Sequence, residues 1–459
     1  MAISVARRIA FDVLRRVAAE DAYAADLLYA ALESDVKKAD ASLATELVLG
    51  VLRWQRLLDF LLQRDLERRC DQLDLAVLLA LRLGLYQLRY LDRVPQHAVI
   101  NESVELVKRA RKSSAAGMVN AVLRRAAGEA RIAGDKLQKL IAAESPEERL
   151  GILYSHPTWL VARWTRSFGA ARAPALLEAN NRPAPLTCAV LEEGATERVA
   201  ESLRKSGFEV TLGRWLRGAL QISGGTPGSS EAYRSGKINL QDEASQMVMH
   251  LVDAHHSQRT LDACAAPGGK TILLARAAGP RGNVIAGDIH EHRLRIIRDQ
   301  LKRTGTTNVR LVALDATRPL PFSPGFDRVL IDAPCSGTGT LARNPEIRWR
   351  LKPEDLDRAH RSQVAMLRNT LAAAGESARV VYSTCSLEPE ENENVVTEAL
   401  TEVPDWRVAS AREALAPHLQ DAAAVGKFFG ADGFFRTFPP EHGTDGFFAA
   451  VLARHGNPR

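Results

Sequence analysis

The fold of the C-terminal half is decided by the stretch Asp262-Ala263-Cys264-Ala265-Ala266-Pro267-Gly268-Gly269-Lys270. An apolar run, Thr260 to Ala263, leads into this stretch, and a helical pattern from Thr271 to Ala278 follows it. A strand that enters a helix through a glycine turn is typical of an α/β sheet, and such a turn lets a ligand approach free backbone N–H groups. The turn has neither the P-loop spacing GxxxxGK[ST] nor the dinucleotide spacing GxGxxG, so both of those ligand classes are disfavoured.

Further strand-like runs alternate with helical segments toward the C-terminus. They are Asn283 to Gly287, Arg310 to Ala313, Arg328 to Ile331 and Arg379 to Tyr382. This alternation predicts an α/β Rossmann-like domain with a doubly wound, mostly parallel sheet. Open sheets of this kind bind ligands outside the carboxyl ends of their strands. We therefore expect the functional residues in the loops that follow these runs.

Acidic residues stand at the ends of four successive runs. They are Asp262, Asp288, Asp315 and Asp332. A carboxylate at the end of the second strand can accept hydrogen bonds from both hydroxyls of a ribose, so Asp288 is the predicted ribose ligand. Asp315 would meet the adenine edge of a nucleoside that lies across the sheet, although an isolated acid there is more often a turn residue. The ordered series favours the nucleoside interpretation.

The five cysteines are an odd number with no CxxC pair, so neither a disulfide framework nor a metal site is predicted. Cys335, in the string PCSGTG, and Cys385, in TCS, each follow an apolar strand among small residues that leave space for a base. Either is a candidate nucleophile, and composition does not choose between them. Cys70 and Cys188 are predicted to be buried as small hydrophobic residues.

The four acids resemble those of the S-adenosylmethionine-dependent methyltransferases, and the segment DACAAPGGK narrows the resemblance to the RNA cytosine-5 methyltransferases. The resemblance implies S-adenosylmethionine as the cofactor, with its methionine part lined by the glycine loop. The implied cofactor contacts are Cys264, Ala265, Ala266, Pro267, Gly268, Gly269 and Lys270, together with Asp288, Asp315 and Asp332.

The same resemblance implies the catalytic roles. Carbon 5 of cytosine is a poor nucleophile, and a thiolate that adds to carbon 6 pushes electron density onto it. In the RNA branch the TCS cysteine attacks and the PCSG cysteine assists release, which makes Cys385 the nucleophile and Cys335 the release-assisting residue. The DNA cytosine methyltransferases attack with a PC-motif cysteine, so the swapped assignment stays open. Asp332 would bond the exocyclic amine and ring nitrogen 3 of the cytosine.

The N-terminal third has a helical pattern in which Val5, Ile9, Val13 and Val17 recur every four residues. Further helical runs are Ala44 to Leu62, Leu73 to Leu91 and Ala98 to Ala110. This region resembles NusB, an all-helical RNA-binding fold. Short apolar runs around a helical segment, Arg198 to Ser206, indicate a small α+β module. We predict an RNA-binding NusB-like domain over 1-140, the α+β module over 145-238 and the methyltransferase domain over 239-459.

This combination resembles the bacterial 16S ribosomal RNA cytosine-5 methyltransferases. The implied partner is 16S ribosomal RNA that is not fully assembled into the small subunit, in rRNA processing and ribosome biogenesis. A transfer RNA cytosine-5 methyltransferase and a non-catalytic RNA-binding protein are the alternatives. The basic loop Leu341 to Arg350, with one tryptophan, is predicted to contact phosphate and stack on bases. The stretch His442 to Phe448 is predicted to complete the sheet.

The composition agrees with a soluble multidomain protein, since 46% of the 459 residues are hydrophobic and 25% are charged. The net charge of +6 is compatible with a polyanionic partner. Arg7 and Arg8 interrupt what would be the apolar part of a signal peptide, and Arg82 interrupts the most apolar segment. We expect a monomeric cytoplasmic protein without a membrane partner.

Overall fold

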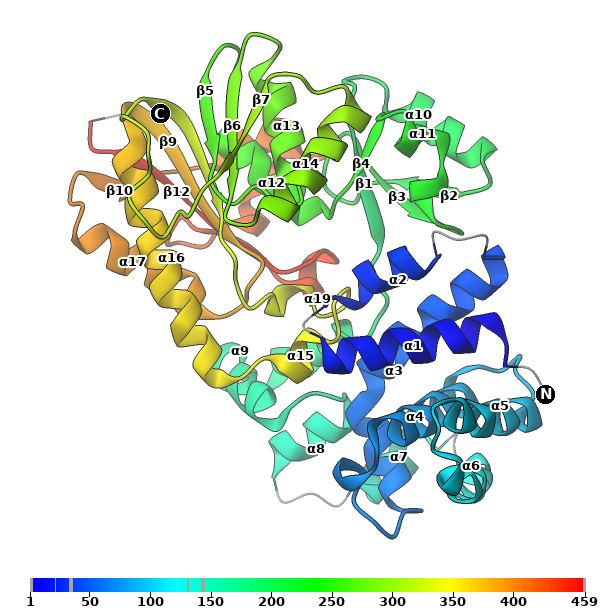
Figure 1. The fold of residues 1–459 in the computed structure, drawn as a ribbon. Coiled ribbons are helices and arrows are strands. Elements are labelled where there is room, and N and C mark those ends of the chain that lie inside the picture. Colours follow the sequence, from blue (N-terminus) through cyan, green and yellow to red (C-terminus); the bar gives the residue numbers. More distant parts are fainter. Residues whose placement is uncertain (1–2, 21, 33–35, 130–131, 142–144, 457–459) are drawn as a thin grey trace. The chain divides into compact units, whose positions relative to one another are not determined.

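The computed structural model describes residues 3–20, 22–32, 36–129, 132–141 and 145–456. They form two compact units (Figure 1). The first, called the helical unit here, comprises Met1–Pro183 and Leu341–Arg350. The second, called the sheet unit, comprises Ala184–Thr340 and Leu351–Arg459. The chain therefore leaves the sheet unit after Thr340 and re-enters it at Leu351.

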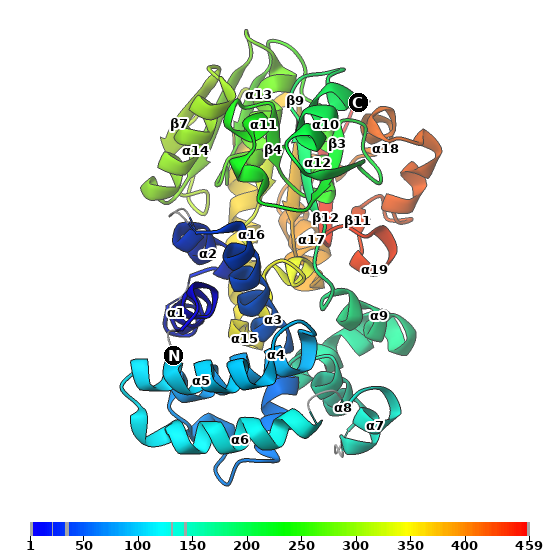
Figure 2. The ribbon, with the colours of Figure 1, turned by 90° about the vertical axis from the view of Figure 1, so that its right-hand side faces the viewer.

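In the described residues of the helical unit the regular elements are helices, as the sequence predicts for its larger part. They are α1 (Val5–Ala19), α2 (Ala24–Leu32), α3 (Lys38–Gln63), α4 (Leu75–Tyr90), α5 (Gln96–Arg109), α6 (Ala116–Glu129), α7 (Gly134–Leu140), α8 (Pro146–Leu153), α9 (Thr158–Ala179) and α15 (Ile347–Arg350), with short 3-10 turns between some of them. Figure 2 shows α5 and α6 lying side by side. No strand occurs in the described residues of this unit.

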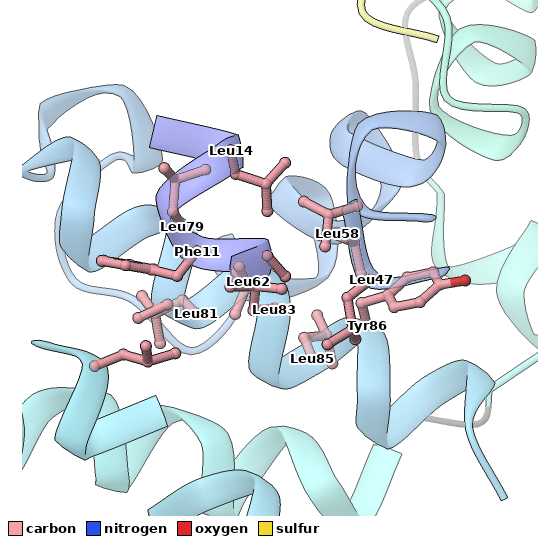
Figure 3. Packing of buried hydrophobic residues seen from close by; sticks show 14 of the residues in the cluster. Phe11, Leu14, Leu47, Leu58, Leu62, Leu79, Leu81, Leu83, Leu85 and Tyr86 are labelled. Carbon is pink, nitrogen blue, oxygen red and sulfur yellow. The ribbon is translucent and has the colours of Figure 1, made fainter. Parts of the chain in front are cut away.

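The core of the helical unit is formed by leucines around α4 (Figure 3). Leu79, Leu81, Leu83 and Leu85 of α4 pack with Phe11 and Leu14 of α1 and with Leu47, Leu58 and Leu62 of α3. Helix α4 lies within the predicted helical run Leu73 to Leu91, and it is buried on nearly every side. Of the residues predicted to recur on one side of α1, Val13 and Val17 are buried, whereas Val5, at the start of that helix, is 38% exposed.

The sheet unit begins with a small antiparallel sheet of order β2-β3-β1-β4. Its strands are β1 (Leu186–Val190), β2 (Glu209–Leu212), β3 (Ala219–Ser223) and β4 (Ile238–Leu240), accompanied by α10 (Thr196–Lys205) and α11 (Glu231–Arg234). These elements confirm the predicted α+β character of this stretch. Tyr233 of α11 stacks under the Arg303 guanidinium at 3.9 Å, which attaches the small sheet to the helices of the larger one.

The larger sheet has the order β10-β12-β9-β8-β5-β6-β7, with β11 paired to β12. Its strands are β5 (Arg259–Asp262), β6 (Asn283–Asp288), β7 (Val309–Ala313), β8 (Phe326–Asp332), β9 (Ala374–Thr384), β10 (Trp406–Val408), β11 (Phe435–Thr437) and β12 (Phe447–Arg454). Strands β5 to β9 pair in parallel, whereas β12 pairs antiparallel with β9 and β10. The predicted doubly wound, mostly parallel sheet is confirmed, and β12 completes it from Phe447 onward.

Helices cover both faces of this sheet. One buried cluster joins it to α12 (Glu243–Val252), α13 (Gly269–Ala278) and α14 (Glu291–Thr304). A second cluster joins it to α16 (Pro353–Ala373) and α17 (Glu393–Thr401). The short helices α18 (Arg412–Leu415) and α19 (Pro439–His442) precede β12.

Strand β5 has β6 on one side and β8 on the other, so the strand order reverses direction at β5. Such a reversal opens a crevice at the carboxyl ends of the strands. The register brings Asp262 opposite Leu330, and Asp332 opposite Ser383. The loops that carry the predicted site therefore leave the same edge of the sheet. Within the described ranges, no helix is long and apolar enough to cross a membrane.

Candidate active site

The glycine loop after β5 encloses a cavity of about 120 Å³. The lining residues are Leu240, Gln241, Ser245, Asp262, Cys264, Ala265, Ala266, Pro267, Gly269, Lys270 and Asp332. Gly268 begins α13 with a φ of 106°, which lies in the region that favours glycine. The Ala265 N–H donates to the Gly287 carbonyl at 2.8 Å, which fastens the loop to β6. The structure thus brings the predicted cofactor loop and Asp332 to one cavity.

Asp262 forms the buried acidic wall of this cavity. Its Oδ2 accepts a hydrogen bond from Thr271 Oγ1 at 2.7 Å, and burial raises the pKa of the carboxyl group to about 7. Its Oδ1 has no hydrogen-bond partner within the described part of the chain. An unpartnered buried oxygen costs free energy, so a ligand that donates a hydrogen bond there would be favoured. This oxygen fits the donor groups of a nucleoside-linked amino acid.

Asp288 and Asp315 stand at the next two strand ends. Asp288 is 5% exposed, and its Oδ1 accepts the His290 N–H at 2.9 Å, while Oδ2 lies 3.7 Å from Arg293 Nη1. Asp288 Oδ2 therefore makes no short hydrogen bond among the described residues, and it is positioned to accept one from a ribose hydroxyl. Asp315 accepts from the N–H and hydroxyl of Thr317, and these hydrogen bonds lower the pKa of its carboxyl group. Asp315 therefore also has the bonding of an ordinary turn residue.

Lys270 and Asp332 form an ion pair within the cavity wall. Lys270 Nζ donates to Asp332 Oδ2 at 2.7 Å, and Ser383 Oγ donates to the other carboxylate oxygen at 2.8 Å. The Lys270 side chain is only 10% exposed and its ammonium lies 5.0 Å from the centre of the Phe447 ring. Two bonds fix the direction of the Asp332 carboxylate. The ion pair joins the glycine loop to the end of β8.

Cys335 and Cys385, fifty residues apart in the sequence, meet at the ends of β8 and β9. Their Sγ atoms are 3.4 Å apart, and both side chains are partly exposed. The hydrogen bond with Cys385 and burial raise the pKa of the Cys335 thiol well above its usual value. Cys335 is therefore protonated at neutral pH. Cys264, in the glycine loop, has a pKa raised by burial and by the neighbouring carboxylates.

Backbone hydrogen bonds join three loops near the two sulfur atoms: the loop after Cys335, the loop that contains Cys385, and the loop before Phe447. The Gly339 N–H donates to the Cys385 carbonyl at 2.9 Å, and the Gly446 N–H donates to the Gly339 carbonyl at 2.8 Å. A Cβ atom on Gly339 would lie 2.1 Å from the Gly446 carbonyl oxygen, so only glycine fits there. The stretch before Phe447, which the sequence predicts as part of a strand, instead supplies this loop.

The other cysteines lie elsewhere. Cys188 is fully buried in β1, which confirms its predicted role, and burial raises the pKa of its thiol to about 12. Cys70 is partly exposed rather than fully buried, and burial raises the pKa of its thiol to about 11.

Sequence reasoning missed Ser383 and Glu391, both of which bond to site residues. The polar residues around TCS and the acidic run that follows it were the available signals.

The prediction that the basic loop Leu341 to Arg350 contacts phosphate is wrong for Arg348. Arg348 is fully buried in the helical unit, where it donates to backbone carbonyls and to Asn181. The Trp349 indole N–H donates to the Leu52 carbonyl at 2.6 Å, and Arg350 donates to the Val17 carbonyl at 2.6 Å. The loop stabilises the helical unit from within, because its donors satisfy carbonyl groups of that unit instead of phosphates.

A doubly wound sheet with a glycine loop after its central strand and acids at the successive strand ends defines an S-adenosylmethionine-dependent methyltransferase. Three family models match the chain. The 16S rRNA methyltransferase RsmB/F model matches residues 249–453, the NusB family model matches residues 4–128, and the ferredoxin-like domain model of RsmF/B-like methyltransferases matches residues 156–228.

Similar proteins extend these matches over the whole chain. The probable ribosomal RNA small subunit methyltransferase B of Bacillus subtilis is 31% identical over 98% of this chain and 99% of its own length. The ribosomal RNA small subunit methyltransferase B of Pseudomonas putida is 31% identical over 87% of this chain and 90% of its own length. The crystal structure of PH0851 has a TM-score of 0.82 at 23% identity and covers 99% of this chain and 100% of its own. The chain belongs to the 16S rRNA methyltransferase RsmB/F family.

Membership of this family confirms the resemblance to the bacterial ribosomal RNA methyltransferases of the Sun/Fmu type, and it confirms S-adenosylmethionine as the cofactor. It also confirms the fold class, with a NusB-like helical domain, a small ferredoxin-like domain and a methyltransferase domain. The individual roles of the site residues stay predictions.

Proposed function

We propose that this chain transfers a methyl group from S-adenosylmethionine to carbon 5 of a specific cytosine in 16S ribosomal RNA, through a covalent cysteine adduct at carbon 6. The observation that carries the proposal is the 3.4 Å separation of Cys335 Sγ and Cys385 Sγ. Cys335 follows, three residues later in the chain, the Asp332 carboxylate that pairs with Lys270. A methyl transfer to an exposed oxygen or nitrogen would need no pair of cysteines. The relatives named as small-subunit methyltransferases support the RNA substrate.

The glycine loop would hold the methionine part of the cofactor, with the unpartnered Asp262 Oδ1 as an acceptor for its amino group. Asp288 would accept bonds from the ribose hydroxyls and Asp315 would meet the adenine edge. When bound, the cofactor supplies an electrophilic methyl group on a sulfonium. The residues Cys264 to Lys270 and the three acids Asp288, Asp315 and Asp332 are the proposed cofactor contacts.

Cys385 attacks carbon 6 of the cytosine as a thiolate. A sulfur–carbon bond forms, and the electron pair of the ring double bond moves to carbon 5, which then accepts the methyl group. Asp332 accepts a hydrogen bond from the exocyclic amine, and the adjacent Lys270 ammonium stabilises the negative charge that develops on the ring and on nitrogen 3. Ser383 keeps the Asp332 carboxylate in one orientation.

Release reverses the addition. The proton leaves carbon 5 for a base, its electron pair re-forms the ring double bond, and the bond between carbon 6 and Cys385 breaks to give a thiolate. Cys335 lies 3.4 Å from the departing sulfur and is proposed to assist this step. The swapped assignment, with Cys335 as the attacking residue, is the alternative that the experiment below separates.

The substrate is proposed to be 16S ribosomal RNA before full assembly of the small subunit, bound in part by the NusB-like domain. We keep the domain limits 1-140, 145-238 and 239-459 and a monomeric, cytoplasmic protein as parts of this proposal. Residues 142–144, between the first two of these domains, lie outside the described residues. The net charge of +6 favours a polyanionic partner.

Bisulfite sequencing of RNA incubated with purified protein and S-adenosylmethionine tests the proposal. We expect one protected cytosine in protein-free 16S RNA, lost in Cys385→Ala, whereas Cys335→Ala should accumulate a denaturation-resistant protein–RNA adduct. Cys70→Ser, a cysteine of the helical unit, is the control and should retain methylation. The opposite behaviour of the two active-site variants would establish the swapped roles. Protection only in transfer RNA would overturn the substrate, and protection nowhere would favour a non-catalytic RNA-binding protein.

A further inference from the structure

A buried glutamate lies beneath the two cysteine loops. Glu391 ends the 3-10 turn η5 (Pro389–Glu391), six residues after Cys385, and its side chain is fully buried. No ion pair with a cation involves it in the described structure, so hydrogen bonds alone compensate its burial. Burial raises the pKa of its carboxyl group, whereas hydrogen bonds from Ser336 and Ser386 lower it.

The Glu391 carboxylate bridges the residues that directly follow each cysteine. Its Oε1 accepts the Ser336 backbone N–H at 2.7 Å, and its Oε2 accepts the Ser336 hydroxyl in a very short bond. The same Oε2 accepts the Ser386 hydroxyl at 2.5 Å. The two serine oxygens are 3.1 Å apart. One carboxylate thus holds the Cys335 loop and the Cys385 loop together.

The glutamate is itself held from two other elements. Gln363 of α16 donates from Nε2 to Glu391 Oε1 at 3.2 Å and to the Pro334 carbonyl at 2.9 Å. The Tyr382 hydroxyl of β9 donates to the Glu391 carbonyl at 2.6 Å. Glu391 is therefore bonded to a helix, α16, and to a strand, β9, as well as to the two cysteine loops. A bridge of this kind restricts how far the two loops can separate.

We infer that Glu391 is the positioning residue that sets the distance between the sulfur atoms of Cys335 and Cys385. The inference rests on the proposed function, in which one sulfur attacks and the other assists release. Strands β8 and β9 pair directly, but their pairing ends at Asp332 and Ser383, before either cysteine. Beyond that point three sets of bonds hold the loops: the Glu391 bridge, the backbone bond of Gly339 to Cys385, and the Thr338 hydroxyl, which accepts the Leu387 N–H at 2.9 Å and lies 3.3 Å from Ser386 Oγ. Of these, only the Glu391 bridge bonds to the residues that directly follow both cysteines. A shift of about 1 Å in reacting groups can reduce a rate about a hundredfold.

The rate at which an azodicarboxamide oxidant (diamide) joins Cys335 to Cys385 measures this distance without RNA or cofactor. The two thiols lose two protons and two electrons to form the disulfide, and the azo compound takes up both and becomes a hydrazine. Peptide mass mapping identifies the 335–385 product. The variants are Glu391→Leu, which removes every acceptor, and Glu391→Gln, which keeps one acceptor and can donate to the serine hydroxyls.

We expect Glu391→Leu to slow disulfide formation about tenfold or more, and Glu391→Gln to remain within about threefold of wild type. Glu398→Gln is the matched control, since Glu398 is an exposed acid of α17 that pairs with His360, and it should leave the rate unchanged. Ser386→Ala removes one arm of the bridge and should give an intermediate rate even if Glu391→Leu fails to fold. Wild-type rates in folded Glu391→Leu, or in Ser386→Ala, would overturn the inference.

Methylation assays on the same variants separate this inference from the proposed function. With 16S RNA, Glu391→Leu should lower kcat about tenfold or more while the Kd for S-adenosylhomocysteine stays unchanged, and Glu391→Gln should restore most of kcat. Slow disulfide formation together with an inactive wild type would keep the positioning role and reject cytosine methylation. An unchanged kcat in an active Glu391→Leu enzyme would reject the positioning role alone.

Discussion

The buried Arg348 allows a quantitative prediction about the helical unit. Its guanidinium lies among neutral acceptors: Nη1 donates to the Ser155 carbonyl at 3.1 Å and to Asn181 Oδ1 at 2.9 Å, and Nη2 donates to the Asn180 carbonyl at 3.1 Å and to the Leu341 carbonyl at 3.3 Å. Burial lowers the pKa of Arg348 to about 9, so the group is charged at neutral pH. Arg348→Met removes this charge and all of its hydrogen bonds.

The expected loss follows from two opposing effects. Each buried acceptor that loses its donor costs about 1–3 kcal/mol, and this penalty applies to several acceptors at once. The substitution also relieves the burial of a cation that has no carboxylate bonded to it, which offsets several kcal/mol. We expect a net loss of about 3–5 kcal/mol in the free energy of unfolding of the helical unit, because four acceptors lose their donor and the relieved burial of the cation returns only part of that cost. Arg348→Lys should lose less, because an ammonium still supplies three donors.

Hydrogen exchange measured by mass spectrometry on peptides of α8, α9 and Leu341–Arg350 reports this free energy. A local method is needed because a chain of two units does not unfold in a single two-state step. Arg69→Met is the control: Arg69 is 73% exposed and pairs with Asp71, so it should change stability by less than about 1 kcal/mol. If Arg348→Met protected these peptides as well as Arg69→Met does, the guanidinium network would not stabilise the unit and the reasoning would be wrong.

Burial and the stacked His418 ring lower the pKa of His250 to about 3, so the unfolded chain takes up a proton near pH 6.5 while the folded chain does not. The sheet unit should therefore lose about 1–2 kcal/mol of stability between pH 7 and pH 5, and His250→Phe should lose less, as measured by hydrogen exchange of α12 peptides with the intrinsic exchange rate taken into account at each pH. Asp288→Ala should weaken cofactor binding by about 1.5–3 kcal/mol in calorimetry, and an unchanged Kd would remove Asp288 from the site. Gly50→Ala would bring a Cβ atom within 2.0 Å of the Tyr86 ring and should lower the thermal stability of the helical unit by about 1–3 kcal/mol. Gly117→Ala, which meets no atom within 4 Å, should instead raise it by about 0.5–1 kcal/mol, and a matching loss there would contradict the steric explanation.

The parallel strands and the acids at their ends could be predicted because both depend only on short, continuous stretches of the chain. Five apolar runs, each followed by a loop, match β5 to β9 closely, and Asp262, Asp288 and Asp332 occupy strand ends as expected. The period of apolar residues reports local backbone structure, and the rule that ligands bind at the carboxyl edge of a parallel sheet then indicates where the site lies.

The loop Leu341–Arg350 shows where this reasoning fails. An arginine beside a tryptophan has the same sequence pattern whether its donors meet phosphates or backbone carbonyls. The choice depends on whether several carbonyl groups converge around the side chain, and those of Ser155 and Asn180 come from residues far from Arg348 in the sequence. Glu391 was missed for the same reason: the acidic run after TCS indicates that an acid lies near the site, but nothing in that run shows which acid bonds to Ser336 and Ser386.

The sequence by itself determined the class of fold and the family, and it singled out the glycine loop and the pair of candidate cysteines, because these depend on local periodicity and on motifs of adjacent residues. The tertiary structure alone decided that the two sulfur atoms meet at 3.4 Å, that Lys270 pairs with Asp332, and that a chain segment after the Cys335 loop is built into the helical unit. These are contacts between residues distant in the chain. Their partners are selected by the packing of whole elements, which no single stretch of sequence encodes.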